Sequence, residues 1–261
     1  MTEKIRNYKS FIISSIHNEA IQLFRQSKFG LNWVILQPLF QVALYALVLS
    51  NVLSNKISAN TGQYDYPLYL ISGILCWTLF AEILQRSVVM FLERSYLIKK
   101  SNFPLMCIPL IVVGVAVFNN IMLLAATLVV CLCIGQGLTF AVLSVVPIML
   151  TLILFSAAVG LFAGVINVFI RDVQPMIAVI LQVLFWGTPI VYPYSILPDI
   201  CKILIKFNPL YYFVELYHQV ILYQTFPDVS VLASLMMISF ALLFCSVFIF
   251  KQAKNELVDV L

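Results

Sequence analysis

A run of 70 residues, 101–170, contains no Asp, Glu, Lys or Arg, and it constrains the fold more than any other feature of the chain. As a single α-helix it would be about 105 Å long, more than three times the hydrocarbon thickness of a bilayer. The run therefore has to fold back, and the glycines at 135 and 137 mark the best turn. We predict two spans, at 106–133 and 139–167. Gly160 and Gly164 of the second span have a spacing that permits close helix packing.

The composition of the whole chain agrees with a membrane location. The chain is 62% hydrophobic and 10% charged, whereas soluble domains carry about 25% charged residues. Its apolar runs are continuous and do not alternate, which favours spanning helices over barrel strands. We therefore predict an all-α integral membrane protein that forms a single transmembrane domain over residues 1–261.

Four further spans are expected, at residues 32–53, 67–92, 173–192 and 229–250. Residues 1–31 precede the first span, and Ile5, Tyr8, Ile12 and Ile16 recur there at helical spacing. This pattern predicts an amphipathic helix in the membrane interface, although a simple charged lead-in remains an alternative.

The segment 193–228 precedes the last span and contains a short apolar stretch, 209–223. This stretch would be about 22 Å long as a helix, which is too short to cross the bilayer. It also carries Glu215 and His218. We therefore expect an extracytoplasmic, re-entrant helical hairpin over 193–228.

The basic residues orient the six predicted spans. The N-terminal segment, the loops 93–105 and 168–172 and the tail 251–261 together carry 11 Lys and Arg residues, and the opposite side carries three. Cytoplasmic segments are enriched in Lys and Arg, so the side with 11 is cytoplasmic. Both termini are expected in the cytoplasm.

The sequence contains no recognisable catalytic group. It has no Gly-Lys pair, so a phosphate-binding P-loop is absent. His17 and His218 are far apart in the sequence and lack metal-ligand spacing. We therefore expect neither an enzyme nor a metal or cofactor in this chain, and no nucleic-acid partner.

Glu82 and Arg86 are the two charged residues within the predicted spans, and they lie four residues apart on one helix face. Charges inside a membrane are costly and often functional, so the two residues are candidates for a gate or a substrate contact. A local ion pair that ties the span to its surroundings is the simpler interpretation.

Aromatic residues gather toward the outer side of the predicted topology. They are typical of an interfacial belt, or they could stack on the apolar faces of sugar rings. The candidates for glycan stacking are Tyr66, Trp77, Phe80, Phe185, Trp186, Tyr192 and Tyr212.

Two blocks of sequence carry a resemblance to a known family. The first fits the pattern R-x-S-x-x-G-x-x-W-x-x-L-x-P and includes Arg25, Ser27, Gly30, Trp33 and Pro38. The second comprises Arg171, Asp172, Thr188, Pro189, Tyr192, Pro193, Asn208 and Pro209. Both resemble polysaccharide-exporting permeases of the ATP-binding-cassette class over nearly the whole chain, although the family often has Ser where Thr188 stands.

This resemblance implies a function and a set of partners. Such permeases are homodimers that work with two copies of a separate ATPase, which uses the ATP and Mg. They export lipid-linked polysaccharide, such as O-antigen, across the bacterial inner membrane.

The resemblance also assigns the cytoplasmic loop 93–105 to a short coupling helix that docks on the ATPase. Leu97 and Ile98 would insert into the ATPase as an apolar knob, next to Ser95 and Tyr96. Arg94, Lys99 and Lys100 would be the flanking charges.

Three other functions stay open at this point. A permease for a drug or a small lipid could have the same architecture. A stand-alone ion-coupled carrier would need no ATPase. A membrane-embedded transferase fits least well, because no acid and base residues converge.

Overall fold

The computed structural model describes residues 11–19, 21, 33, 35–44, 65–100, 104–135 and 139–261, without the side chains of 65, 97 and 100. Every regular element in these ranges is a helix, which confirms the all-α class. Arg25, Ser27 and Gly30 of the first family block, and most of the predicted first span, lie outside the described residues.

Four helices are long and apolar enough to cross a membrane: α3 (Asp65–Glu93), α5 (Cys107–Cys133), α6 (Val145–Phe169) with the preceding 3-10 turn η1 (Phe140–Ser144), and α10 (Val229–Val260). The shorter elements are α4 (Ser95–Lys100), α7 (Val173–Gly187), the 3-10 turn η2 (Tyr194–Ile196), α8 (Asp199–Lys206) and α9 (Pro209–Ile221). Residues 11–19 and 35–44 are also helical.

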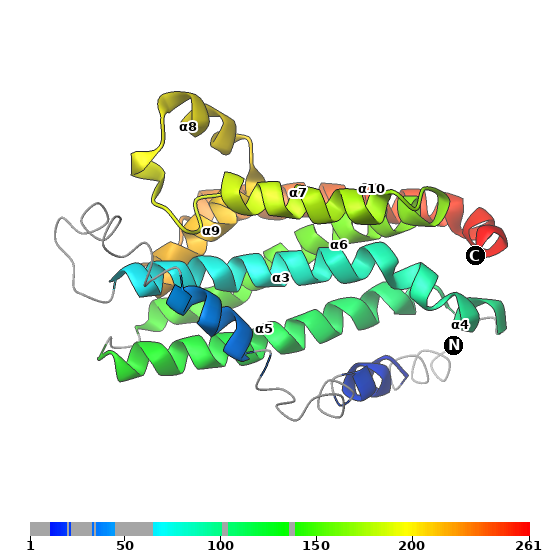
Figure 1. Cartoon of the computed structure of the whole chain (residues 1–261), viewed down its shortest axis with the longest axis horizontal. Coiled ribbons are helices and arrows are strands. Elements are labelled where there is room, and N and C mark those ends of the chain that lie inside the picture. The colour runs from blue at the N-terminus through cyan, green and yellow to red at the C-terminus, as the bar shows by residue number, and fades with distance from the viewer. Residues whose placement is uncertain are drawn as a thin grey trace.

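The long helices run side by side along the length of the molecule (Figure 1). Helix α4 and the C-terminus lie at one end, and α8 stands off the bundle toward the other end. Helix α3 packs against α5, α6, α7 and α9, so it is the central helix of the bundle. The most apolar part of α3 is 78% buried inside the protein, whereas the most apolar part of α10 is 17% buried.

Small residues bring α3 and α6 into close contact. A Cβ atom at Gly160 would lie 2.7 Å from the Cβ atom of Ser87, and one at Gly164 would overlap the carbonyl oxygen of Ser87. Asn167, farther along α6, donates from Nδ2 to the carbonyl oxygen of Val88 at 2.8 Å. The spacing of the two glycines therefore does permit the close packing expected of it.

Helix α7 is shorter than the span predicted at 173–192, because it ends at Gly187. Pro189 disfavours helical geometry at Thr188, which adopts an extended backbone. At 15 residues, the helix is about 22 Å long and does not reach the length of a full span. The six-span arrangement therefore stays a prediction, with four long helices observed.

The last segment also differs from the expected polar tail, because α10 continues as a helix to Val260. Leu257 is fully buried and belongs to the same apolar cluster as Phe250, Phe91 and Ile98. Burial of these apolar side chains extends the helix beyond the predicted end of the span at residue 250.

Candidate functional site

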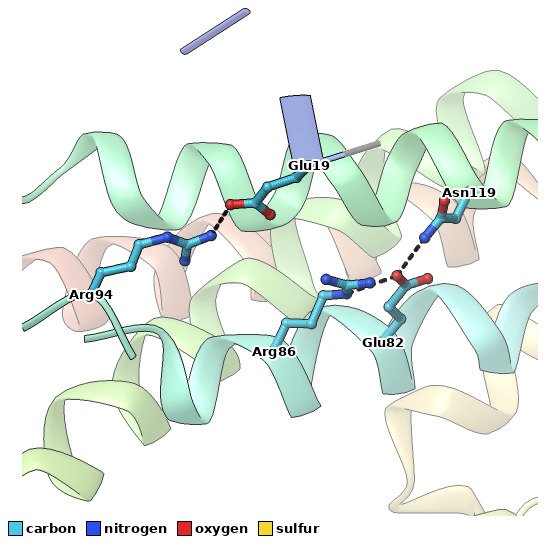
Figure 2. Close-up of polar contacts among 5 residues, drawn as sticks. All are labelled: Glu19, Glu82, Arg86, Arg94 and Asn119. Atoms are coloured by element: carbon cyan, nitrogen blue, oxygen red, sulfur yellow. Dashed lines mark hydrogen bonds and ion pairs between the residues drawn. The ribbon is translucent and has the colours of Figure 1, made fainter. Parts of the chain in front are cut away.

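The charged pair of α3 belongs to a polar contact with α5. Arg86 donates from Nε to Oε1 of Glu82 at 2.8 Å, and Asn119 of α5 donates from Nδ2 to the same oxygen at 2.6 Å. Figure 2 shows the three side chains directed toward one another between the two helices. An ion pair, the simpler of the two interpretations, is thus present, and a role as a gate stays a prediction.

A second amide continues this contact toward the start of α3. Asn120 donates from Nδ2 to the carbonyl oxygen of Leu75 at 3.0 Å and lies 3.5 Å from the hydroxyl of Thr78. The Oδ1 atoms of Asn119 and Asn120 are buried without a hydrogen-bond partner among the described residues. The asparagines were not among the predicted site residues, although two adjacent Asn residues inside a charge-free run were a readable signal.

A cavity of about 430 Å³ opens at this contact. Its wall combines the helical stretch 35–44 with α3 and α5. Among the described residues, eight polar or charged side chains line it: Gln37, Gln41, Thr78, Glu82, Gln85, Arg86, Asn119 and Asn120. The other described lining residues are Trp33, Pro38, Trp77, Ala81 and Leu123. We call this space the polar cavity; it includes Trp33 and Pro38 from the first family block.

The predicted coupling segment is helical as α4, which begins directly after Arg94. Arg94 forms an ion pair with Glu19 of the N-terminal helical stretch, as Figure 2 shows. Ile16 of the same stretch packs so closely on α5 that a Cβ atom at Gly114 would collide with it. The N-terminal stretch is therefore attached both to α5 and to the start of α4.

The structure gives Ile98 a different environment from the expected apolar knob. Its side chain is 6% exposed and belongs to a cluster with Met90, Leu105 and Leu257, so it stabilises the attachment of α4 to the bundle. Tyr96 is 63% exposed, and Lys99 is also exposed. Ser95 is half-buried, and the side chains of Leu97 and Lys100 lie outside the described part of the chain.

The second family block forms a corner where the chain leaves α7. Asn208 donates from Nδ2 to the hydroxyl of Thr188 at 2.9 Å, and its Oδ1 atom caps α9 by accepting from the amide of Leu210 at 3.0 Å. Pro209 occupies the first turn of α9, where its missing N–H is harmless. Because the contact needs a hydroxyl, the Ser that is common in the family would serve as well as Thr188.

Two tyrosines of α3 hold the other side of this corner. Tyr69 donates from its hydroxyl to the carbonyl oxygens of Pro189 and Tyr192, at 2.8 Å and 3.0 Å. The hydroxyl of Tyr66 donates to the carbonyl oxygen of Val191 at 3.1 Å. Tyr192 in turn donates to the carbonyl oxygen of Trp186, and burial raises the pKa of its phenol. Pro193 then leads into η2.

The predicted stacking aromatics separate into three places. Trp77 lies 5.9 Å from Phe80 and 5.4 Å from Phe185, and Phe185 lies 5.5 Å from Trp186, measured between ring centroids. Tyr66 and Tyr192 belong to the corner described above. Tyr212 instead makes an edge contact with Tyr211, at 5.1 Å between ring centroids. Of these aromatic residues, Trp77 is the one that lines the polar cavity.

Other features complete the site. Arg171 and Asp172 form the short exposed turn between α6 and α7.

His218 of α9 is buried and stacks on Tyr69 at 3.9 Å between ring centroids. Sequence reasoning missed this contact because 149 residues separate the partners. Within the described residues, no three His, Cys, Asp or Glu side chains converge in a way that could hold a metal ion.

Comparison with known proteins supplies the relatives of this chain. It is 25% identical to the O-antigen export system permease protein RfbA of Myxococcus xanthus over 261 residues, which cover 99% of this chain and 98% of the relative. RfbA of Klebsiella pneumoniae is 26% identical over 72% of this chain and 70% of its own length. The polysialic acid transport protein KpsM of Escherichia coli is 23% identical over 76% of each chain.

The family comparison agrees with the resemblance drawn from the sequence motifs. The model of the ABC-2 type transporter family matches residues 11–222, from the N-terminal helical stretch to the residue after α9. This range contains the polar cavity, α4 and the corner at Thr188. With four helices long enough to cross a bilayer, this multi-pass membrane protein belongs to the ABC-2 type transporter family.

Proposed function

We propose that this chain is the transmembrane permease subunit of an ATP-driven exporter of lipid-linked polysaccharide. One observation carries the proposal above the others. The similarity to the O-antigen export permease of Myxococcus xanthus extends over 99% of this chain and 98% of the relative. The match therefore extends over every segment of this chain that the proposal uses, from the N-terminal helical stretch to α10.

ATP hydrolysis is assigned to a separate partner. The sequence lacks a P-loop, so it cannot bind the nucleotide phosphates in the manner of an ATPase. Two permease copies with two ATPase copies would form the working complex in the bacterial inner membrane. Both termini and α4 would face the cytoplasm, in line with the distribution of Lys and Arg.

Helix α4 is the proposed contact for the ATPase. The exposed side chains of Tyr96 and Lys99 support this role, because an exposed aromatic beside a cation offers both apolar area and charge to a partner. The burial of Ile98 identifies it as the residue that fixes α4 to the bundle. ATP-driven movement of the partner would thus reach α3 and α5 through α4 and Arg94.

Deletion of the gene in its host tests the assignment of substrate. We expect the surface polysaccharide to be lost and its lipid-linked precursor to accumulate inside the cell, as measured by gel analysis of each fraction. Expression of the intact chain should restore export. A deletion strain with normal surface polysaccharide would contradict the proposal and favour a small-molecule permease.

Variants of α4 test the contact with the ATPase. The double substitution Tyr96→Ala and Lys99→Glu changes exposed side chains, so the permease should remain folded in the membrane but lose most co-purified ATPase and most export. Exposed Phe140 in η1, far from α4 at the other end of α5 and α6, provides the control Phe140→Ala. Normal ATPase recovery with the double variant would exclude α4 as the docking site.

A further inference from the structure

We propose that the polar cavity binds a neutral, hydroxyl-rich group, namely a sugar ring, at membrane depth. The inference rests on the proposed function for the origin of the sugar, but the cavity itself carries the chemistry. A volume of about 430 Å³ falls within the range of about 300–1,000 Å³ that is typical of small-molecule sites.

The cavity lies in the membrane-spanning part of the bundle. Glu82 is 17 residues after the start of α3 and 11 before its end, which places it about 25 Å and 16 Å from the two ends of the helix. Asn119 is similarly close to the middle of α5. Eight polar or charged side chains therefore gather where lipid tails would be the ordinary surroundings.

The structure of the bundle does not need so much polarity at this place. The α3 and α6 contact forms at the same depth with glycines and a serine. Arg86 uses Nε for Glu82, and a guanidinium has further donors on its two terminal nitrogens. Among the described residues, those nitrogens have no hydrogen bond. The exposed amides of Gln37 and Gln85 also line the cavity.

The balance of charge selects the class of ligand. Glu82 and Arg86 are the charged side chains of the described lining and neutralise each other at 2.8 Å, so the described wall has no net charge to offer an ion. A phosphate would meet the carboxylate of Glu82, and an acyl chain would leave the polar side chains unpaired at a cost in free energy. Hydroxyl groups, which both donate and accept, match a wall of amides, a carboxylate and a guanidinium.

Trp77 adds the apolar surface that a sugar ring requires. Its indole lines the cavity and makes an edge contact with Phe185 at 5.4 Å between ring centroids. A flat ring held in this way can stack on the C–H face of a pyranose, while the hydroxyls reach the amides. The sugar could belong to the exported glycan or to a glycolipid headgroup of the membrane, because the ring chemistry is the same.

Photo-crosslinking in the host, with the full chain and its ATPase, tests the proposal. The photoreactive residue p-benzoylphenylalanine replaces Gln85, whose side chain is exposed on the cavity wall. The matched control is the same residue at Ile121, which is 50% exposed on α5, two positions from Asn119, and does not line the cavity. We expect a carbohydrate-bearing adduct at 85 and phospholipid adducts alone at 121, identified by mass spectrometry.

Phospholipid adducts alone at 85, or no adduct there, would overturn the proposal. The same adduct in a host strain that makes no surface polysaccharide would assign the sugar to a glycolipid headgroup. Loss of that adduct in the strain would assign it to the exported glycan.

Substitution of Trp77 provides a second readout, with the crosslinker kept at 85. Trp77→Leu should lower the yield of the carbohydrate adduct about fivefold, because one stacking contact is worth about 1 kcal/mol. Trp77→Phe keeps an aromatic ring and should retain most of the yield. Equal yields from both variants would exclude stacking on Trp77.

The outcome is separable from the test of the proposed function. A deletion strain that loses surface polysaccharide, combined with no carbohydrate adduct at 85, would overturn the cavity as a sugar site and leave the exporter assignment intact.

Discussion

The two sides of α3 use opposite means to hold a neighbouring helix at the same depth of the bundle. Toward α6, Ser87 lies so close to Gly160 and Gly164 that a Cβ atom would not fit. Toward α5, Glu82 and Arg86 meet Asn119 through hydrogen bonds beside a cavity of about 430 Å³.

The comparison separates packing from function. In lipid, helices associate mainly through van der Waals contact, so small residues suffice to hold two helices together where their backbones approach closely. The α6 side is such a contact, with one hydrogen bond from Asn167 to the carbonyl oxygen of Val88 near its end. The α5 side keeps costly charges and an open space, which packing alone does not require. We infer that the α6 side stabilises the bundle and that the α5 side has a binding role.

The largest effect is expected from adding a methyl group at the close contact between α3 and α6. Gly164→Ala places a methyl group onto the carbonyl oxygen of Ser87, which has to move together with its helix. We expect a loss of about 3 kcal/mol in the free energy of unfolding, since a backbone shift is needed. Thermal unfolding of the purified full-length protein in detergent measures it.

Gly187 at the end of α7 is the matched control, because no atom of the described residues lies within 4 Å of a Cβ atom there. Gly187→Ala should change the free energy of unfolding by less than about 0.5 kcal/mol. Similar losses of unfolding free energy for both variants would show that the close contact between α3 and α6 is not what makes Gly164 necessary.

A smaller effect is expected on the α5 side. Glu82→Leu leaves Arg86 at membrane depth without its carboxylate and should cost about 2 kcal/mol, less than a fully buried pair would. The side chains of Arg86 and Glu82 are 36% and 25% exposed, which is why the loss is partial. The same unfolding measurement applies.

The double variant Glu82→Leu and Arg86→Leu sharpens this prediction. Apolar replacement of both partners removes the uncompensated charge, so most of the lost stability should return. Export should remain impaired, because the cavity loses its carboxylate and its guanidinium, two of the eight polar or charged side chains named in its wall. Restored export in the double variant would mean that the pair is structural and would end the functional distinction between the two sides.

The smallest effect is expected from Ser87→Ala. Where Ser87 contacts α6, the small size of its side chain matters and its hydroxyl does not. The free energy of unfolding should therefore change by less than about 0.5 kcal/mol. A loss as large as that of Glu82→Leu would indicate that the α6 side also depends on polar contacts.

Much of the helical framework followed from hydropathy. The spans predicted at 67–92, 106–133 and 139–167 agree with α3, α5 and η1–α6 to within a few residues. The end of α7 did not follow, because apolar residues continue to Tyr192 while Pro189 already breaks the helix. The end of α10 was missed for the opposite reason: burial of Leu257 extends a polar segment as a helix.

The site was only partly predictable. Glu82 and Arg86 were recognisable because charges inside an apolar run are conspicuous, and their spacing indicated an ion pair. Asn119 and Asn120 were not selected, since a neutral amide in a helix carries no sign of the helix that it faces. Ile98 had the right composition for a docking surface, but an apolar side chain in a loop does not reveal whether it faces a partner or its own bundle.

By itself, the sequence determined that the chain is helical and embedded in a membrane, and its motifs placed it in a transporter family. These properties depend on hydropathy and on residues close together in the chain. Only the tertiary structure decided which face of each helix is packed, which is polar and which lines a cavity. Every helix in lipid is apolar on most of its surface, so the identity of its neighbours comes from contacts between distant residues, such as those of Ser87 with Gly164 and Glu82 with Asn119.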